Sequence, residues 1–127
     1  TKDGQVVLAR QFRPAQEKYL LELPGGGIDE EESPEQGAAR ELLEETGFAG
    51  ELHFLGTMYE SAYDTMVRYN FAATDCVKVQ EPTHFENEQT EPVLLLLEEF
   101  KKHLQGCELT DVATGYIGLE FLERRAG

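Results

Sequence analysis

The sequence contains no tryptophan and only two cysteines, Cys76 and Cys107. Two cysteines provide no disulfide framework, and these two lack the spacing of a metal-binding motif. We therefore expect two reduced thiols and a cytoplasmic location. Long apolar runs are also missing, since none approaches the roughly 20 residues that a membrane-spanning helix needs. The first four residues are polar, so we find no secretory signal at this end of the sequence.

Basic residues are few. The chain has 11 lysines and arginines against 25 aspartates and glutamates, which gives a formal net charge of −14. An acidic surface repels nucleic-acid polymers and anionic membranes, so we expect neither as a partner. A small phosphorylated substrate is not excluded, because carboxylates that hold divalent cations present positive charge to a phosphate.

The length of 127 residues, with 40% hydrophobic residues, fits one domain that spans residues 1–127 and buries a core of its own. The first residue is Thr1 rather than methionine. We therefore expect the complete protein to carry a longer N-terminal segment.

Hydrophobic patterning and turn residues predict eight elements along the chain. The expected strands cover residues 5–12, 19–23, 51–57, 66–74 and 93–97, the last of them a buried strand of consecutive aliphatic residues. The expected helices cover residues 34–46, 99–105 and 111–124. Strands at the start, a helix in the middle and helices at the end predict an α/β (α+β) sandwich, with a mixed β-sheet between helices.

The middle helix has clear signals at both ends. Ser33 is the expected N-cap, Pro34 occupies the first helical position, and Gln36 completes a capping box. Gly47 is expected to end the helix in the left-handed conformation. Three apolar residues share one arc of the helix and are expected to pack on the sheet: Ala39, Leu42 and Leu43.

Another arc of the same helix is acidic. A helical rotation of 100° per residue places Glu41, Glu44 and Glu45 within roughly 100° of one another. Carboxylates this close repel, and oxygen ligands at this spacing suit Mg²⁺ or Mn²⁺. Arg40 can steady Glu44 through an i,i+4 pair. The pattern alone leaves a solvated helix face as an alternative to a metal site.

The segment 26–48 as a whole is similar to the Nudix signature, G-x5-E-x7-R-E-U-x-E-E-x-G-U, where U is a bulky apolar residue. The nine matching residues are Gly26, Glu32, Arg40, Glu41, Leu42, Glu44, Glu45, Gly47 and Phe48. Nine fixed positions make a chance match very improbable, so the chain is identified as a member of the Nudix hydrolases. Segments 7–14, 21–26 and 106–122 resemble the ADP-ribose and nucleotide-sugar pyrophosphatase branch of that family.

The resemblance implies a set of metal ligands and a base. Glu41 and Glu45 are the expected direct ligands of Mg²⁺, for which Mn²⁺ can substitute, and the Gly25 carbonyl joins them. Glu44 either binds metal or acts as the general base. In this branch a further glutamate from the loop before the late strand assists, and here Glu88 and Glu91 are the two candidates.

The resemblance also implies structural and substrate-binding residues. Arg13 is expected to contact a substrate phosphate or the terminal ribose, with a surface arginine as the alternative. Glu22 is expected to line the pocket, or else to be a structural strand residue. Glu32 and Arg40 orient the helix and the loop before it. The motif residues with structural roles are Gly26, Glu32, Arg40 and Gly47.

The implied function is Mg²⁺-dependent cleavage of the pyrophosphate bond in ADP-ribose or a nucleotide sugar, which yields a nucleoside monophosphate and a sugar phosphate. Segment 58–64 lacks the proline that ADP-ribose-cleaving members often carry, so both substrate types stay open. Two alternatives also stay open: a nucleoside triphosphate pyrophosphohydrolase that removes oxidised nucleotides, and a non-catalytic nucleotide sensor. Members of this branch commonly dimerise, so we expect a homodimer.

Overall fold

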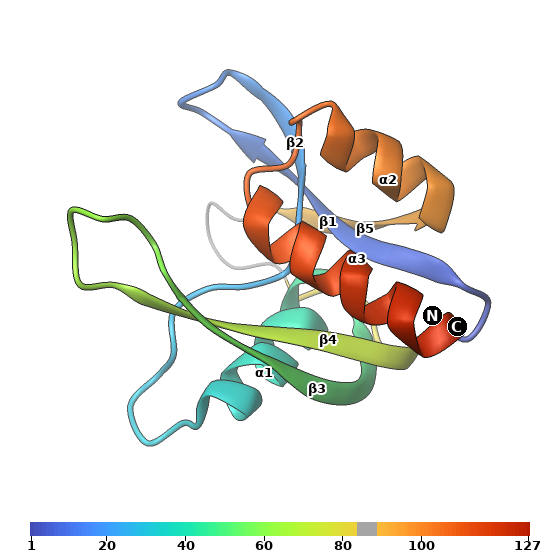
Figure 1. Ribbon diagram of the computed structural model, residues 1–127, viewed down its shortest axis with the longest axis horizontal. Helices are drawn as coiled ribbons and strands as arrows, with labels where there is room; N and C mark the ends of the chain where they lie inside the picture. The colour runs from blue at the N-terminus through green and yellow to red at the C-terminus, as the bar shows by residue number, and fades with distance from the viewer. Residues whose placement is uncertain (84–88) are drawn as a thin grey trace.

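The computed structural model describes residues 1–83 and 89–127, which form two antiparallel sheets and three helices (Figure 1). The elements in chain order are β1 (Gln5–Arg13), β2 (Lys18–Glu22), α1 (Pro34–Thr46), β3 (Phe48–Tyr59), β4 (Val67–Lys78), β5 (Thr90–Leu96), α2 (Leu97–Gln105) and α3 (Val112–Ala126). One sheet has the order β2-β1-β5, and β3 pairs with β4 in the other. No helix in the described part of the chain is both long and apolar enough to cross a membrane.

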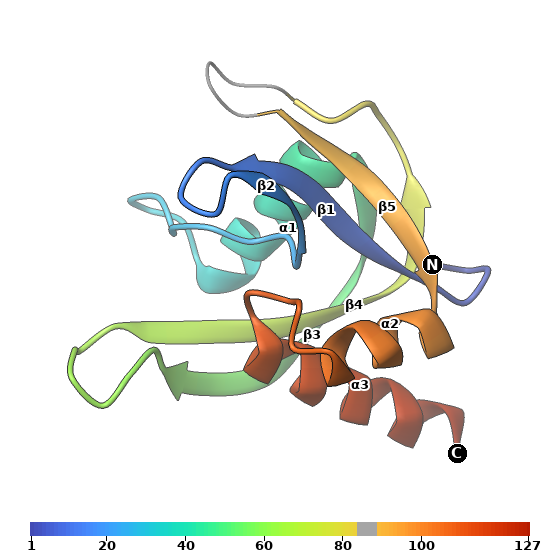
Figure 2. The same cartoon turned by 90° about the horizontal axis from the view of Figure 1, so that it is seen from above.

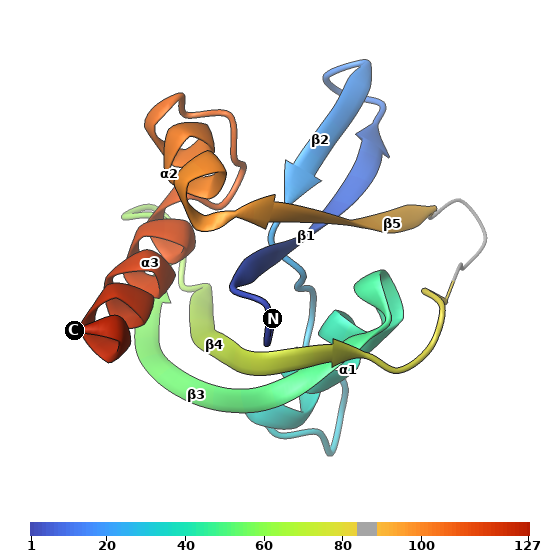
Figure 3. The same cartoon turned by 90° about the vertical axis from the view of Figure 1, so that its right-hand side faces the viewer.

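The helices cover the sheets from two sides. Helix α1 lies between the two sheets on one side, and α2 and α3 lie together on the opposite side (Figures 2 and 3). This arrangement confirms the predicted α/β sandwich. The single mixed sheet is replaced by two sheets, in which every pairing among the described strands is antiparallel. Short hairpin connections between β1 and β2 and between β3 and β4 impose that direction.

Helix α1 begins and ends where the sequence predicts. The Ser33 hydroxyl accepts a hydrogen bond from the Gln36 amide at 3.1 Å, and the Gln36 side chain accepts one from the Ser33 amide at 2.9 Å. Gly47 has φ 79° and closes the helix. On the inner face Leu42 is buried as predicted, but Ala39 is exposed. Thr46, one turn beyond Leu42, is fully buried instead, because the sheets cover the C-terminal half of the helix more deeply.

The strands differ from their predicted bounds and burial more than helix α1 does. β3 and β4 extend beyond the predicted 51–57 and 66–74, because each supplies the other with a pairing partner along its whole length. The prediction of a buried strand at 93–97 was wrong. Leu94 and Leu96 of β5 are 40% and 57% exposed, because this part of the edge strand is left uncovered on the face that they share with Thr90.

Two apolar clusters hold the layers together. The larger one joins Leu8 of β1 to α2 and α3, and its buried members are Leu8, Phe100, Leu104, Leu109 and Leu119. The smaller one joins α1 to the second sheet through Leu42, Phe48 and Cys76. Because α1 is packed from both sheets, its outer acidic face has a fixed orientation relative to β1 and β5.

One pair of glycine substitutions tests this account of α1. Gly47→Ala should destabilise the protein by about 1–2 kcal/mol or more, because φ 79° disfavours a Cβ and the new methyl group would collide with the Gln80 carbonyl. Gly118→Ala is the matched control: it lies inside α3 with open space around it, and should stabilise by about 0.5–1 kcal/mol. Urea unfolding of both variants measures the difference. Equal effects would contradict the assigned geometry of Gly47.

Candidate functional site

A cleft of about 440 Å³ lies between the N-terminal loop of α1, the acidic face of α1 and the ends of β1 and β5. Seven residues singled out from the sequence line it: Arg13, Gly25, Gly26, Arg40, Glu41, Glu44 and Glu45. Five others complete it: Gln11, Gly27, Asp29, Thr83 and Thr90. The structure therefore gathers the signature carboxylates and Arg13, from elements far apart in sequence, around one space.

Strand alternation explains how the sheet contributes. Gln11 and Arg13 lie two residues apart on β1 and so share one face, and Gln11 pairs across the sheet with Thr90 of β5. The buried Thr90 hydroxyl donates a hydrogen bond to the Glu45 carbonyl at 3.0 Å. The Thr83 amide donates to the Glu44 carbonyl at 2.8 Å. These two bonds fix the last turn of α1, where two of the acidic side chains originate.

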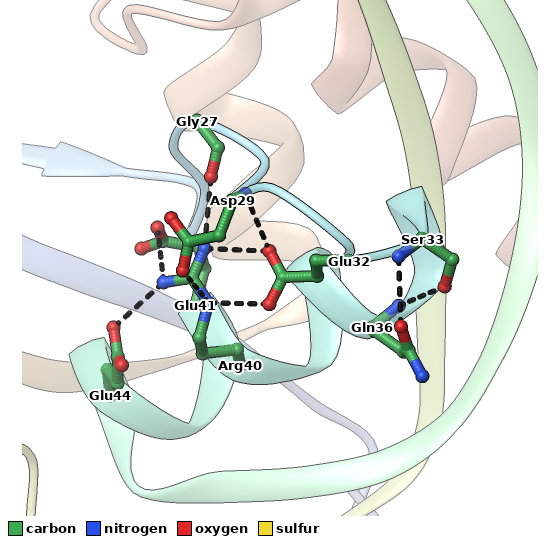
Figure 4. A network of polar contacts seen from close by, with 8 residues as sticks. All are labelled: Gly27, Asp29, Glu32, Ser33, Gln36, Arg40, Glu41 and Glu44. Atoms are coloured by element: carbon green, nitrogen blue, oxygen red, sulfur yellow. Dashed lines mark hydrogen bonds and ion pairs between the residues drawn. The ribbon is translucent and has the colours of Figure 1, made fainter.

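Arg40 is the centre of the polar network in the cleft (Figure 4). Its Nε and Nη2 donate to the Glu32 carboxylate at 2.8 and 3.1 Å, and Nη2 also donates to the Gly27 carbonyl at 3.0 Å. Nη1 donates to Glu41 at 3.1 Å and to Glu44 at 3.2 Å. One guanidinium thus ties the glycine loop to the acidic face of the helix.

This network shifts the pKa values of its members. The hydrogen bond from Arg40, followed by one from the Asp29 amide, holds the pKa of Glu32 below its usual value. The pKa of Arg40 is raised, chiefly by Glu32. Both groups are therefore charged at neutral pH, and Glu32 and Arg40 form a permanent ionic connection between loop and helix.

Glu41 and Glu45 form the second polar feature of the cleft. Burial, followed by a hydrogen bond and charge repulsion from Glu41, raises the pKa of Glu45 to about 8, while a backbone hydrogen bond from Gly25 opposes the rise. The negative charge of Glu22 adds to the repulsion. Because its pKa is raised, Glu45 holds a proton at neutral pH when no cation is bound.

Two glycines allow the carboxylates to come this close to the loop. A Cβ at Gly26 would lie 2.5 Å from Oε1 of Glu41, and one at Gly37 would lie 3.0 Å from Oε1 of Glu32. The backbone of the loop consequently sits directly against the acidic side chains. Such contact is what a metal site with a backbone carbonyl ligand needs.

Arg13 reaches the cleft from the opposite wall. Its Nε and one terminal nitrogen donate to the two carboxylate oxygens of Glu22, both at 2.6 Å. Glu22 is 9% exposed and does not line the cleft itself. A two-point pair of this kind fixes the plane of the guanidinium, so Glu22 orients Arg13 within the cleft.

Other residues named from the sequence lie elsewhere. Glu91 neighbours Thr90 on β5 and therefore points to the opposite face of the sheet, where it pairs with Arg10 at 2.6 Å. The structure thus does not bring Glu91 to the cleft. Glu88 lies outside the described residues. In segment 58–64, Tyr59 and Tyr63 are 75% and 98% exposed and do not line the cleft.

Several residues of the cleft were not predicted from the sequence. Asp29 lies 3.4 Å from Nε of Arg40, and Gln11, Thr83 and Thr90 complete the walls. Gln11 could have been found, because it precedes Arg13 by two residues on a predicted strand. Nothing local in the sequence places Thr83 or Thr90 beside α1, since their positions depend on how the sheet folds over the helix.

The donor set fits a divalent cation, although the side chains are not arranged around one. No group of three or more histidine, cysteine, aspartate or glutamate side chains among residues 1–83 and 89–127 has the geometry of a metal cage. Glu41 and Glu44 instead point to Nη1 of Arg40, and Glu45 bonds to Glu41. The charge of Glu41 helps to raise the pKa of Glu45, which marks a place where a cation would relieve charge repulsion, so these residues could hold a metal ion.

A family model and several known proteins are similar to this chain. A family model described as NUDIX domain matches residues 1–110. The chain is 30% identical over 126 residues to an ADP-ribose pyrophosphatase of Bacillus subtilis (strain 168), which covers 97% of this chain and 68% of that protein. It is 55% identical over 47 residues to an ADP-sugar pyrophosphatase of Mus musculus, which covers 37% of this chain and 22% of that protein.

A solved structure shows the same fold. The crystal structure of an ADP compounds hydrolase matches with a TM-score of 0.81 at 26% identity, over 97% of this chain and 69% of that one. The chain therefore spans about two thirds of the bacterial relative and of this structure, and about a fifth of the mouse relative.

The raised pKa of Glu45 predicts how the stability of the metal-free protein responds to pH. Because the pKa of Glu45 in the folded protein lies above its ordinary value of 4.5, the folded state holds a proton that the unfolded chain releases. Raising the pH from about 4.5 to about 8 should therefore destabilise the parent protein relative to Glu45→Gln, whose amide keeps the neutral form at every pH.

Thermal unfolding in a chelator across this range measures the effect. Glu35→Gln, an exposed position in the first turn of α1, is the matched control and should follow the parent. If the curves of Glu45→Gln and the parent run parallel, the assigned carboxylate pair is incorrect.

Proposed function

This chain belongs to the Nudix family of hydrolases, which act on pyrophosphate bonds, and we propose that it cleaves ADP-ribose or a nucleotide sugar with the help of Mg²⁺. The products would be a nucleoside monophosphate and a sugar phosphate. The observation that carries the proposal is the cleft itself, in which three glutamates of α1 face an arginine of β1.

The metal would be held by oxygen ligands on the acidic wall. Glu41, Glu45 and the backbone of Gly25 are the proposed direct ligands, and all three line the cleft. Glu44 is either a further ligand or the general base that accepts a proton from the attacking water. When bound, Mg²⁺ neutralises phosphate charge and lowers the pKa of a water molecule, and Mn²⁺ can do the same.

The residues of the opposite wall bind and orient the substrate. We propose that Arg13, fixed by Glu22, contacts a phosphate or the terminal ribose. Glu32 and Arg40 keep the glycine loop against α1, so that backbone and side-chain ligands stay together. Glu88 remains a candidate base on sequence grounds alone.

The relatives support the choice of substrate. The bacterial relative carries the name ADP-ribose pyrophosphatase, and the mouse relative carries the name ADP-sugar pyrophosphatase. Both names describe a nucleoside diphosphate joined to a sugar, which agrees with a cleft that offers both acidic metal ligands and an arginine.

Assembly and location are also proposals. We propose a homodimer, because Phe54 and Tyr69 leave a pair of exposed rings on the β3–β4 sheet, 59% and 44% exposed. Sedimentation of the purified protein tests this directly. We propose the cytoplasm because both cysteines are free thiols, Cys76 buried and Cys107 exposed.

A substrate panel tests the proposed reaction. With Mg²⁺, the purified protein should release AMP from ADP-ribose, or the corresponding monophosphate from another nucleotide sugar, faster than it attacks nucleoside triphosphates. Chromatography of the products identifies the bond that breaks. Preferential release of pyrophosphate from triphosphates would replace this proposal, and no turnover of either class would favour a nucleotide sensor.

A matched pair of variants tests the acidic wall. Glu45→Gln should lower kcat by about 100-fold or more with the fold retained, because it removes a proposed metal ligand. Glu35→Gln makes the same chemical change outside the cleft and should leave kcat within about twofold of the parent. Circular dichroism verifies that both variants are folded. Parental activity in Glu45→Gln would remove Glu45 from the site.

A further inference from the structure

Arg40 occupies the position of a counter-cation in the cleft. We propose that its Nη1 competes with a divalent ion for Glu41 and Glu44, so that metal binding displaces Nη1 while the rest of the guanidinium stays anchored. The proposal rests on the proposed function in one respect, namely that a divalent ion binds these glutamates. It adds that Arg40 weakens metal affinity while it stabilises the metal-free protein.

The contacts of Arg40 fall into two groups. Nε and Nη2 make the anchoring contacts, to both oxygens of Glu32 at 2.8 and 3.1 Å and to the Gly27 carbonyl at 3.0 Å, and Nε also lies 3.4 Å from the Asp29 carboxylate. Nη1 makes the other contacts, to Glu41 at 3.1 Å and Glu44 at 3.2 Å. No atom of the guanidinium serves both groups, so the second group can be lost without the first (Figure 4).

Donor chemistry supports this division. A guanidinium has five N–H donors in a rigid plane, of which two belong to Nη1. The remaining three belong to Nε and Nη2, and these satisfy Glu32 and Gly27. Glu32 is only 14% exposed in its side chain and stays charged beside Arg40, so this two-point pair is the stronger anchor.

The contacts from Nη1 to Glu41 and Glu44 are the ones that a metal ion can replace. Glu41 and Glu44 each receive one contact from Nη1, and both contacts are longer than the Nε–Glu32 bond. The two carboxylates are 16% and 26% exposed, so a cation entering the cleft can reach them. Each carboxylate keeps a second oxygen and further lone pairs, but a divalent ion bound there would lie beside the positively charged Nη1, and repulsion between the two cations makes them compete for Glu41 and Glu44.

Competition by Arg40 and a purely structural role of Arg40 predict opposite changes in metal affinity. If Arg40 only held Glu41 and Glu44 in a geometry ready for metal, its removal would weaken metal binding. If Nη1 competes, its removal frees two carboxylates and strengthens metal binding, although the metal-free protein loses stability. The direction of the change in the metal dissociation constant therefore separates the two roles.

Calorimetric titration with Mn²⁺ tests the direction. Arg40→Gln should lower the dissociation constant about 3- to 10-fold relative to Arg10→Gln, and its metal-free melting temperature should be below that of Arg10→Gln. Arg10→Gln is the control for charge, because it also removes one positive charge but breaks only the exposed pair with Glu91, on the opposite face of the sheet. An equal or higher dissociation constant in Arg40→Gln would overturn the proposal.

The unaltered protein gives a second test that does not depend on the folding of a variant. Crystal structures with and without Mn²⁺ should show the contacts from Nη1 to Glu41 and Glu44 broken by the ion, with the Nε–Glu32 bond kept. If the Nη1 contacts persist beside a bound ion, the inference about Arg40 is wrong, while the proposed metal site stands. Failure of the parent to bind Mn²⁺ in the cleft would overturn the proposed metal site as well.

Discussion

The crowding of carboxylates on one face of α1 is the constraint around which the molecule is built. Glu41, Glu44 and Glu45 face one cleft, and like charges at this spacing raise the energy of the folded state. Two responses are visible in the structure. Arg40 pairs with Glu41 and Glu44, and burial beside Glu41 raises the pKa of Glu45, so that Glu45 holds a proton. Both responses are ones that a divalent cation can replace.

The surrounding fold keeps the acidic helix α1 in place. Helix α1 is packed between two sheets, and its inner face is held by Leu42 and the fully buried Thr46. Thr83 and Thr90 bind the backbone carbonyls of Glu44 and Glu45, so the acidic turn is fixed from the side of the sheets. The energy of apolar burial thus offsets the cost of gathering negative charge.

The sequence predicted local features best, because short-range chemistry determines them. The bounds of α1, its capping box and the left-handed Gly47 were all confirmed, since each depends on residues within one turn of the helix. Five of the signature residues line one cleft, namely Gly26, Arg40, Glu41, Glu44 and Glu45, and Arg13 lines the same cleft. Roles of individual residues in the reaction stay predictions.

Features that depend on distant parts of the chain could not be predicted. Glu91 was a candidate because it lies in the expected loop region, yet strand alternation in β5 turns it away from the cleft and Thr90 toward it. The exposure of Leu94 and Leu96 depends on β5 being an edge strand, which no local pattern shows. The division of the strands into two sheets likewise follows from tertiary packing.

The central claim is that Glu41 and Glu45 together bind a divalent ion, and counting bound Mn²⁺ by electron paramagnetic resonance tests it most directly. The account predicts that the parent protein removes Mn²⁺ from the free signal in stoichiometric amounts, and that a folded Glu41→Gln, Glu45→Gln double variant does not. Equal binding by the two proteins, or no binding by the parent, would contradict it.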